Sequence, residues 1–211
     1  MWAADDDQHA PHFVEYLLDL LNKSPAAGLA FCGMDIVNRK GNLIGELAHF
    51  SRFSSTPDKL ADARRFLAEH EICGKANPIY GLFRREAVID TLNRLWKGKP
   101  SIDGAWSADV VFVFATITKF KFIAGDDILF RKLKPTEKDT RVRYESAWYN
   151  KGVPISEYKQ YTQALIESTD DEEIKRIIRS IMTSRLVAEI FIGKTIKPIA
   201  KLLNRIRPRK A

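Results

Sequence analysis

Residues 27–47 read AGLAFCGMDIVNRKGNLIGEL, and the prediction of the fold starts from this stretch. Its first eleven residues, 27–37, have the apolar composition of a β-strand. Residues 39–42 are Arg-Lys-Gly-Asn, which is typical of a turn, and residues 43–47 form a second extended piece. The stretch therefore predicts a β-hairpin.

Helical patterns lie on both sides of this hairpin. Residues 12–21 place apolar side chains at the spacing of one helix face, and Pro11 suits the first helical turn. Further helices are predicted at 57–69, 84–96, 156–167 and 170–192. Residues 79–83 predict a short strand, and residues 122–130 predict two extended pieces. By its own pattern, the segment 108–120 fits either a helix or a buried strand. Strands that alternate with helices predict an α/β domain.

Composition and charge narrow the class of protein. The chain has 211 residues, of which 45% are hydrophobic and 29% charged, as expected for a globular protein. Its net charge of +7 comes from the C-terminal end, because residues 174–211 carry +10 and residues 1–173 carry −3. An acidic body argues against nucleic acid as a partner of the domain. Two distant cysteines and the lack of a signal-peptide pattern favour a cytoplasmic location.

Three consecutive aspartates, Asp5, Asp6 and Asp7, follow a short apolar stretch and precede the first predicted helix. At the end of a strand, alternate carboxylates project from the same side. Such a pair is able to hold one Mg²⁺ or Mn²⁺ ion, which would neutralise the charge of a departing diphosphate. The alternative is that the aspartates cap the helix and complement its dipole.

Three segments together carry a resemblance to a known family. Residues 2–44, WAADDDQHAPHFVEYLLDLLNKSPAAGLAFCGMDIVNRKGNLI, contain a strand, a D-x-D motif, a helix, and a strand followed by a turn. Residues 76–92 read ANPIYGLFRREAVIDTL, and residues 107–132 read SADVVFVFATITKFKFIAGDDILFRK. In order and spacing these segments resemble family 2 glycosyltransferases over residues 1–135. The resemblance favours a helix for the segment 108–120.

The resemblance implies a GT-A fold and an inverting reaction, in which an acceptor hydroxyl displaces a nucleoside diphosphate from a sugar. It makes Asp5 and Asp7 the expected ligands of Mn²⁺ or Mg²⁺, with Asp6 facing the donor sugar or ribose. Asp109 is the expected general base, because a carboxylate near the acceptor is able to remove the hydroxyl proton. The alternative for Asp109 is a helix N-cap, since it stands before an apolar run.

Other residues are candidates for substrate contacts. Arg84 and Arg85 follow the short strand and are able to bind phosphate or acceptor, or alternatively they open a solvent-facing helix. Tyr80 and Trp106 are able to stack on a sugar face, although an aromatic side chain in a half-buried loop also serves packing.

The segment 129–134, LFRKLK, departs from the family pattern. Relatives often carry a histidine after the arginines, and this histidine is missing. Arg131 or Lys134 would then supply the positive charge for the leaving group, whereas the alternative for this region is a solvated run of charges.

We predict two parts in the chain. Residues 1–135 form the D-x-D and acceptor-side half of a glycosyltransferase domain, and residues 136–211 form a helical C-terminal extension. The family's full domain has a nucleotide-binding strand, loop and helix before the D-x-D motif. This half is expected to be missing, so that the sheet lacks its first strands and the polypeptide alone is not expected to catalyse transfer.

Residues 194–207 predict a basic amphipathic helix, which either lies on an anionic membrane surface or packs on its own domain. The combined expectation is a glycosyltransferase that uses a nucleotide-sugar donor and a carbohydrate or lipid-linked acceptor, peripheral to the inner face of the membrane. The alternative is a non-catalytic fragment, or a membrane-surface interaction module, with the same fold.

Overall fold

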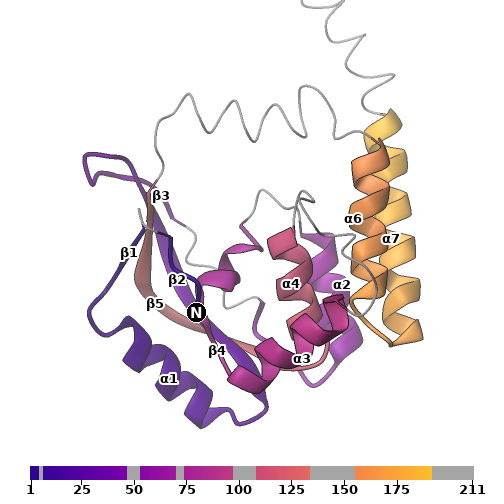
Figure 1. Cartoon of the computed structure of the whole chain (residues 1–211). Helices are drawn as coiled ribbons and strands as arrows, with labels where there is room; N and C mark the ends of the chain where they lie inside the picture. The colour runs from indigo at the N-terminus through magenta and orange to yellow at the C-terminus, as the bar shows by residue number, and fades with distance from the viewer. Residues whose placement is uncertain (5–6, 47–52, 70–73, 97–107, 134–154, 192–211) are drawn as a thin grey trace, which may run out of the picture.

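The computed structural model of the protein describes residues 1–4, 7–46, 53–69, 74–96, 108–133 and 155–191. In these residues the chain forms a mixed β-sheet with helices on both sides of it (Figure 1). This arrangement confirms the predicted α/β class.

Two long parallel strands form the centre of the sheet. β2 (Ala27–Val37) pairs with β5 (Lys121–Leu133), from Ala27 opposite Lys121 to Val37 opposite Leu133. Because the two strands are parallel, both end at the same edge of the sheet. Short antiparallel strands complete the sheet: β1 (Gln8–His9) on β5, and β3 (Leu43–Glu46) and β4 (Leu82–Phe83) on β2. The pairing of β2 with β3 confirms the predicted hairpin.

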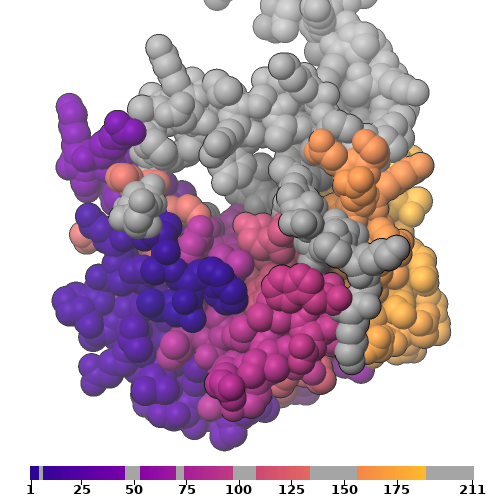
Figure 2. Space-filling model, in the orientation of Figure 1, coloured from indigo at the N-terminus to yellow at the C-terminus, as the bar shows by residue number. Residues whose placement is uncertain are grey.

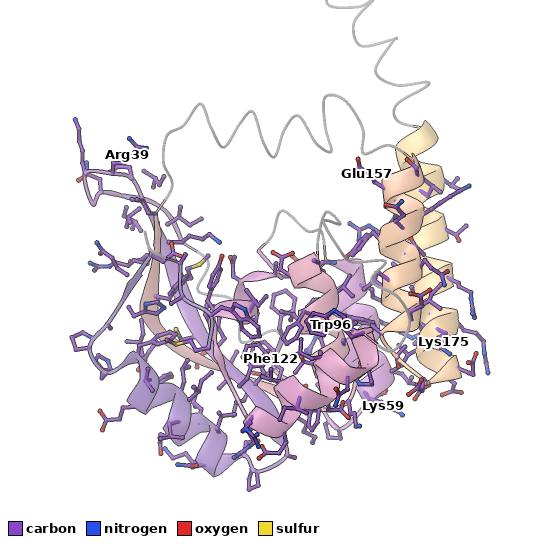
Figure 3. All side chains as sticks on the ribbon, in the orientation of Figure 1. Arg39, Lys59, Trp96, Phe122, Glu157 and Lys175 are labelled. Carbon is purple, nitrogen blue, oxygen red and sulfur yellow. The ribbon has the colours of Figure 1, made fainter. Side chains whose placement is uncertain are left out.

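The helices form a layer on each side of the sheet. α1 (Phe13–Lys23) packs against β2 and β5 from one side, and α3 (Arg85–Trp96) and α4 (Ala108–Ile117) lie on the other (Figure 1). Phe122, at the start of β5, is buried between the sheet and these helices (Figure 3).

Three further helices extend the second layer. α2 (Lys59–Ala68) packs against α7 (Glu172–Phe191), and α6 (Ile155–Glu167) packs against α4. The buried apolar side chains of α6 and α7 belong to the same hydrophobic cluster as those of α1 and the sheet. The two predicted C-terminal helices therefore share one core with the α/β part. Within the described residues, no helix combines the length and the apolar character needed to cross a membrane.

α4 resolves the ambiguity of the segment 108–120 in favour of a helix. All eight residues from Val110 to Ile117 are buried, because the helix is covered by the sheet and by its neighbours. A helix that is apolar on every side shows no amphipathic period, and so its pattern matches that of a buried strand.

The predicted strand 79–83 is only half correct. Residues 82–83 form β4, whereas Asn77–Tyr80 form a 3₁₀ turn, η3. Pro78 suits the beginning of such a turn because it has no N–H to leave unbonded. A Cβ atom on Gly81 would lie 2.2 Å from the carbonyl oxygen of Ala30, which is too close for any side chain. Only glycine therefore fits where the chain passes β2.

The two extended pieces predicted in 122–130 form one continuous strand with an irregularity inside it. Ala124 lies opposite Phe31 and Ile128 lies opposite Gly33, so β5 contains extra residues in this interval. The strand therefore bulges around Asp126 and Asp127, whose side chains are exposed.

Candidate functional site

The acidic motif leads to the end of the parallel strands. Oδ1 of Asp7 accepts a hydrogen bond of 3.1 Å from the backbone N–H of Leu133, the last residue of β5. We call this region, residues 34–37 of β2 and 130–133 of β5, the carboxyl end of the sheet. In open α/β sheets, ligands bind outside the carboxyl ends of the parallel strands. The carboxylate of Asp7 is thus fixed where a ligand is expected.

The residues before the acidic motif lie against β4 and α4. The ring of Trp2 is 5.4 Å from that of Phe83 and 5.1 Å from that of Phe112, both in edge-on geometry. Figure 2 shows the dark indigo N-terminal residues on the surface beside the magenta segments. Trp2 therefore lies beside α4, and Asp7 lies at the last residue of β5.

Asp109 lies in the first turn of α4. Its side chain is exposed, and its Oδ1 accepts a hydrogen bond of 2.8 Å from the backbone N–H of Val110. Only residues 118–120 separate α4 from β5, so the helix runs back against the direction of the strand. The first turn of α4 is therefore directed toward the carboxyl end of the sheet (Figure 1). Asp109 is the second residue of α4, and its carboxylate accepts from the next residue rather than from one two or three positions further on, as an N-cap would; it is also open to solvent.

η3 is attached to the carboxyl end of the sheet by two side chains of β5. The ring of Tyr80 stacks on that of Phe130, with centroids 5.4 Å apart and planes 21° apart. Nζ of Lys132 lies 4.6 Å from the centroid of the Tyr80 ring and donates a hydrogen bond of 3.0 Å to Oδ1 of Asn77. Tyr80 therefore serves packing and also lies at the carboxyl end, beside a cation.

Arg131 lies at the same end but is held loosely. Its Nε is 3.9 Å from Oδ2 of Asp35, the residue opposite it in β2, and its side chain is 62% exposed. Asp35 adds an acidic side chain to this end that the sequence did not single out.

Arg84 occupies a different place from the one the substrate-binding hypothesis requires. Its guanidinium donates to the carbonyl oxygens of Leu21, at 2.6 Å, and Ala27, at 2.9 Å. Ala27 begins β2, and Val37 ends it, about 33 Å further along an extended strand. Arg84 therefore joins α1 to the beginning of β2, at the end of the sheet opposite to the carboxyl end. Arg85, the exposed first residue of α3, follows directly after it.

Several predicted residues lie outside the described part of the chain. These are Asp5, Asp6, Trp106, Lys134 and the basic segment 194–207. Among the residues that the structure describes, no three His, Cys, Asp or Glu side chains gather as a metal-binding group. Of the predicted metal ligands, only Asp7 is placed.

Sequence reasoning did not select Lys132 and Asn77, although both lie at the carboxyl end. Lys132 follows Phe130 by two residues, which in a strand places the two side chains on the same face. This alternation could have placed Lys132 on the same face of the strand as Phe130. Its contact with Asn77 could not be predicted in this way, because it joins segments far apart in the sequence. Comparison with known proteins gave no further guide, since no family model, curated protein or solved structure matches the chain.

Proposed function

We propose that this chain is the acceptor-side half of an inverting, metal-dependent glycosyltransferase with a GT-A fold. The observation that carries the proposal is the position of Asp7, whose carboxylate is bound to the last residue of β5. The resemblance to family 2 glycosyltransferases implies that a metal ion and a diphosphate bind at the acidic motif. The carboxyl ends of parallel strands are also where α/β proteins commonly bind such ligands.

The donor chemistry fits Mg²⁺ or Mn²⁺. Carboxylate oxygens are the hard ligands that these ions prefer. The amide of Leu133 orients the Asp7 carboxylate before any ligand arrives, which favours binding. Asp7 and Asp5 would hold the ion, which would neutralise negative charge on the diphosphate of a nucleotide-sugar donor.

Asp109 is the proposed general base. As the oxygen of the acceptor hydroxyl attacks C1 of the donor sugar, the exposed carboxylate of Asp109 takes its proton. The bond from C1 to the diphosphate breaks on the opposite side of the sugar, which inverts the configuration. The acceptor is a carbohydrate or a lipid-linked hydroxyl compound, as the resemblance implies.

Calorimetric titration with Mn²⁺, alone and with a panel of nucleoside diphosphates, tests the proposal. The matched variants are Asp5→Ala/Asp7→Ala and, as control, Asp126→Ala/Asp127→Ala, which removes two neighbouring exposed aspartates from the bulge of β5. We expect the first variant to lose binding of Mn²⁺ and of the Mn²⁺-dependent diphosphate, and the control to keep both. Equal binding by all three proteins, or none by the unmodified chain, would rule out the proposed metal site.

A further inference from the structure

α3 presents apolar side chains to solvent as well as to the core. Its buried residues are Ala87 and Thr91. Ile89, 42% exposed, and Trp96, 64% exposed and labelled in Figure 3, project from the other side of the helix. Residues seven apart lie on the same helix face, two turns from each other, and half-buried Leu92 lies between these two. The outer side of α3 therefore carries an apolar stripe.

A second exposed tryptophan lies beside the beginning of α3. Trp2 is 40% exposed, and its ring contacts that of Phe83, two residues before the helix. Figure 2 shows the N-terminal residues, in dark indigo, on the same face of the molecule as the magenta residues of α3. We call the surface formed by Trp2, Ile89 and Trp96 the tryptophan face.

The segment that contains α3 is basic. Residues 84–99, RREAVIDTLNRLWKGK, contain five Lys or Arg and two Asp or Glu, a net charge of +3, although residues 1–173 together carry −3. Arg85 is exposed and lies four residues before Ile89, which places both on the same side of the helix. A tryptophan ring combines an apolar body with a polar N–H, and basic residues attract anionic lipids. Together these features are typical of a helix that lies in a membrane interface.

The exposed apolar residues of α1 have different neighbours. Val14 and Leu18, four residues apart, are about as exposed as Ile89. The residues that follow them are the exposed carboxylates Glu15 and Asp19, and α1 contains no tryptophan. An anionic surface repels these carboxylates. The two helices therefore expose similar aliphatic side chains, but only the surroundings of α3 complement an anionic membrane.

We propose that the tryptophan face binds the headgroup region of a membrane that contains anionic lipids. In this arrangement α3 lies along the membrane surface. Ile89 and Trp96 enter the boundary between headgroups and acyl chains, while the guanidinium of Arg85 pairs with lipid phosphates. This contact depends neither on the proposed transferase activity nor on the basic segment 194–207.

Flotation of the full chain with lipid vesicles tests the proposal. The probes are vesicles of phosphatidylcholine alone and vesicles that also contain phosphatidylglycerol. Ile89→Ser/Trp96→Ser removes two apolar side chains of the tryptophan face, and Val14→Ser/Leu18→Ser is the matched control on α1. We expect the unmodified chain and the control to bind the anionic vesicles, more weakly at high salt. Ile89→Ser/Trp96→Ser is expected to bind about tenfold to a hundredfold more weakly, as for the loss of buried apolar area.

Three results would overturn the proposal. The first is the absence of binding by the unmodified chain. The second is equal binding by the unmodified chain and Ile89→Ser/Trp96→Ser, which would assign the contact to another segment such as 194–207. The third is a self-association, measured by sedimentation, that the same variant weakens while no protein binds vesicles, because the face would then be covered by a second copy of the chain.

A second measurement applies if Ile89→Ser/Trp96→Ser does not fold. Trp2→Phe/Trp106→Phe/Trp148→Phe leaves Trp96 as the only one of the four tryptophans of the chain. Anionic vesicles with brominated acyl chains quench the fluorescence of a tryptophan that enters the membrane. We expect them to quench Trp96, whereas unchanged fluorescence of vesicle-bound protein would exclude Trp96 from the contact and refute the proposal.

Discussion

The two ends of the central strands use arginine in different ways. At the beginning of β2, the donors of Arg84 are bonded to backbone carbonyl oxygens of Leu21 and Ala27. At the carboxyl end, the side chain of Arg131 is 62% exposed, and its Nε lies 3.9 Å from Oδ2 of its acidic neighbour, Asp35, which is long for an ion pair. An arginine whose donors are bonded to carbonyl oxygens supports the fold, whereas exposed charge at the ends of parallel strands is suited to binding ligands. Residue type alone does not distinguish these roles.

The helical layer contains a second arginine of the supporting kind. Arg94 of α3 donates to the carbonyl oxygens of Ala115, in α4, and Ser168, after α6, each at 2.7 Å. It also forms an ion pair of 2.8 Å with Asp90. One guanidinium thus joins three parts of the structure.

Replacing Arg94 is expected to give the largest loss of stability. In Arg94→Met, the carbonyl oxygens of Ala115 and Ser168 lose a charged donor in a largely buried position. We therefore expect the free energy of unfolding to fall by about 4 kcal/mol. Urea unfolding followed by circular dichroism measures the effect. Arg85→Met is the control, since its exposed side chain is expected to change the free energy of unfolding by less than about 0.5 kcal/mol. Similar values for the two variants would contradict the account of the network.

Arg84→Met is expected to give the next largest loss of stability, and to do so without changing the affinity for Mn²⁺. The loss of two charged hydrogen bonds is expected to cost about 3 kcal/mol in the free energy of unfolding. Mn²⁺ affinity should stay unchanged, because Arg84 lies at the opposite end of the sheet from Asp7. Urea unfolding and calorimetry on the same samples check both parts. A selective loss of Mn²⁺ or diphosphate binding in a stable Arg84→Met protein would restore the substrate-binding hypothesis.

Asp90 should make the stability of the helical layer depend on pH. Burial by itself raises the pKa of Asp90, but hydrogen bonds from Lys119 and Arg94 outweigh it, and the pKa is lowered overall. Its contribution is therefore present above the ordinary pKa of aspartate, about 3.9, and is lost as the pH falls through the lower value of the folded state.

We expect Asp90→Asn to lose less stability than the unmodified protein when the pH is lowered from about 6 to about 3. Urea midpoints at the two pH values measure the difference. Asp19→Asn, at an exposed ion pair with Lys23 in α1, is the control. A steeper loss in Asp90→Asn than in the unmodified protein would reverse the sign and exclude this explanation.

Arg131→Met is expected to have the smallest effect on stability. Exposed ion pairs contribute between 0 and about 1 kcal/mol, and the distance to Asp35 is long, so we expect a change below about 0.5 kcal/mol. Urea unfolding measures it beside Arg84→Met. A cost comparable to that of Arg84→Met would remove the contrast between the two ends.

The sequence predicted those features that depend on local pattern. The strand 27–37 has the predicted bounds, and the helix predicted at 84–96 is observed at Arg85–Trp96. The turn η3 was missed because residues 79–83 are apolar and aromatic, while the geometry of Pro78 and the close passage of Gly81 past Ala30 decide their conformation.

The candidate site was predictable only where the family resemblance supplied it. Asp7 and Tyr80 lie at the carboxyl end of the sheet, but nothing in the sequence shows which carbonyl oxygens attract Arg84. Likewise, Lys132 gains its position from a contact with Asn77, 55 residues away in the sequence. Such long-range contacts follow from the packing of η3 on β5 and are not encoded in either segment alone.

The most direct test of the central claim is paramagnetic broadening by Mn²⁺ in amide NMR spectra of the isotope-labelled chain. The account predicts that substoichiometric Mn²⁺ broadens the signals of Asp7, Leu133 and Lys132, and leaves those of Gly28 and Arg84 sharp. In Asp5→Ala/Asp7→Ala this selective broadening should disappear. Broadening centred at the beginning of β2, or unchanged in the double variant, would contradict the assignment of the metal-diphosphate site to the carboxyl end of the sheet.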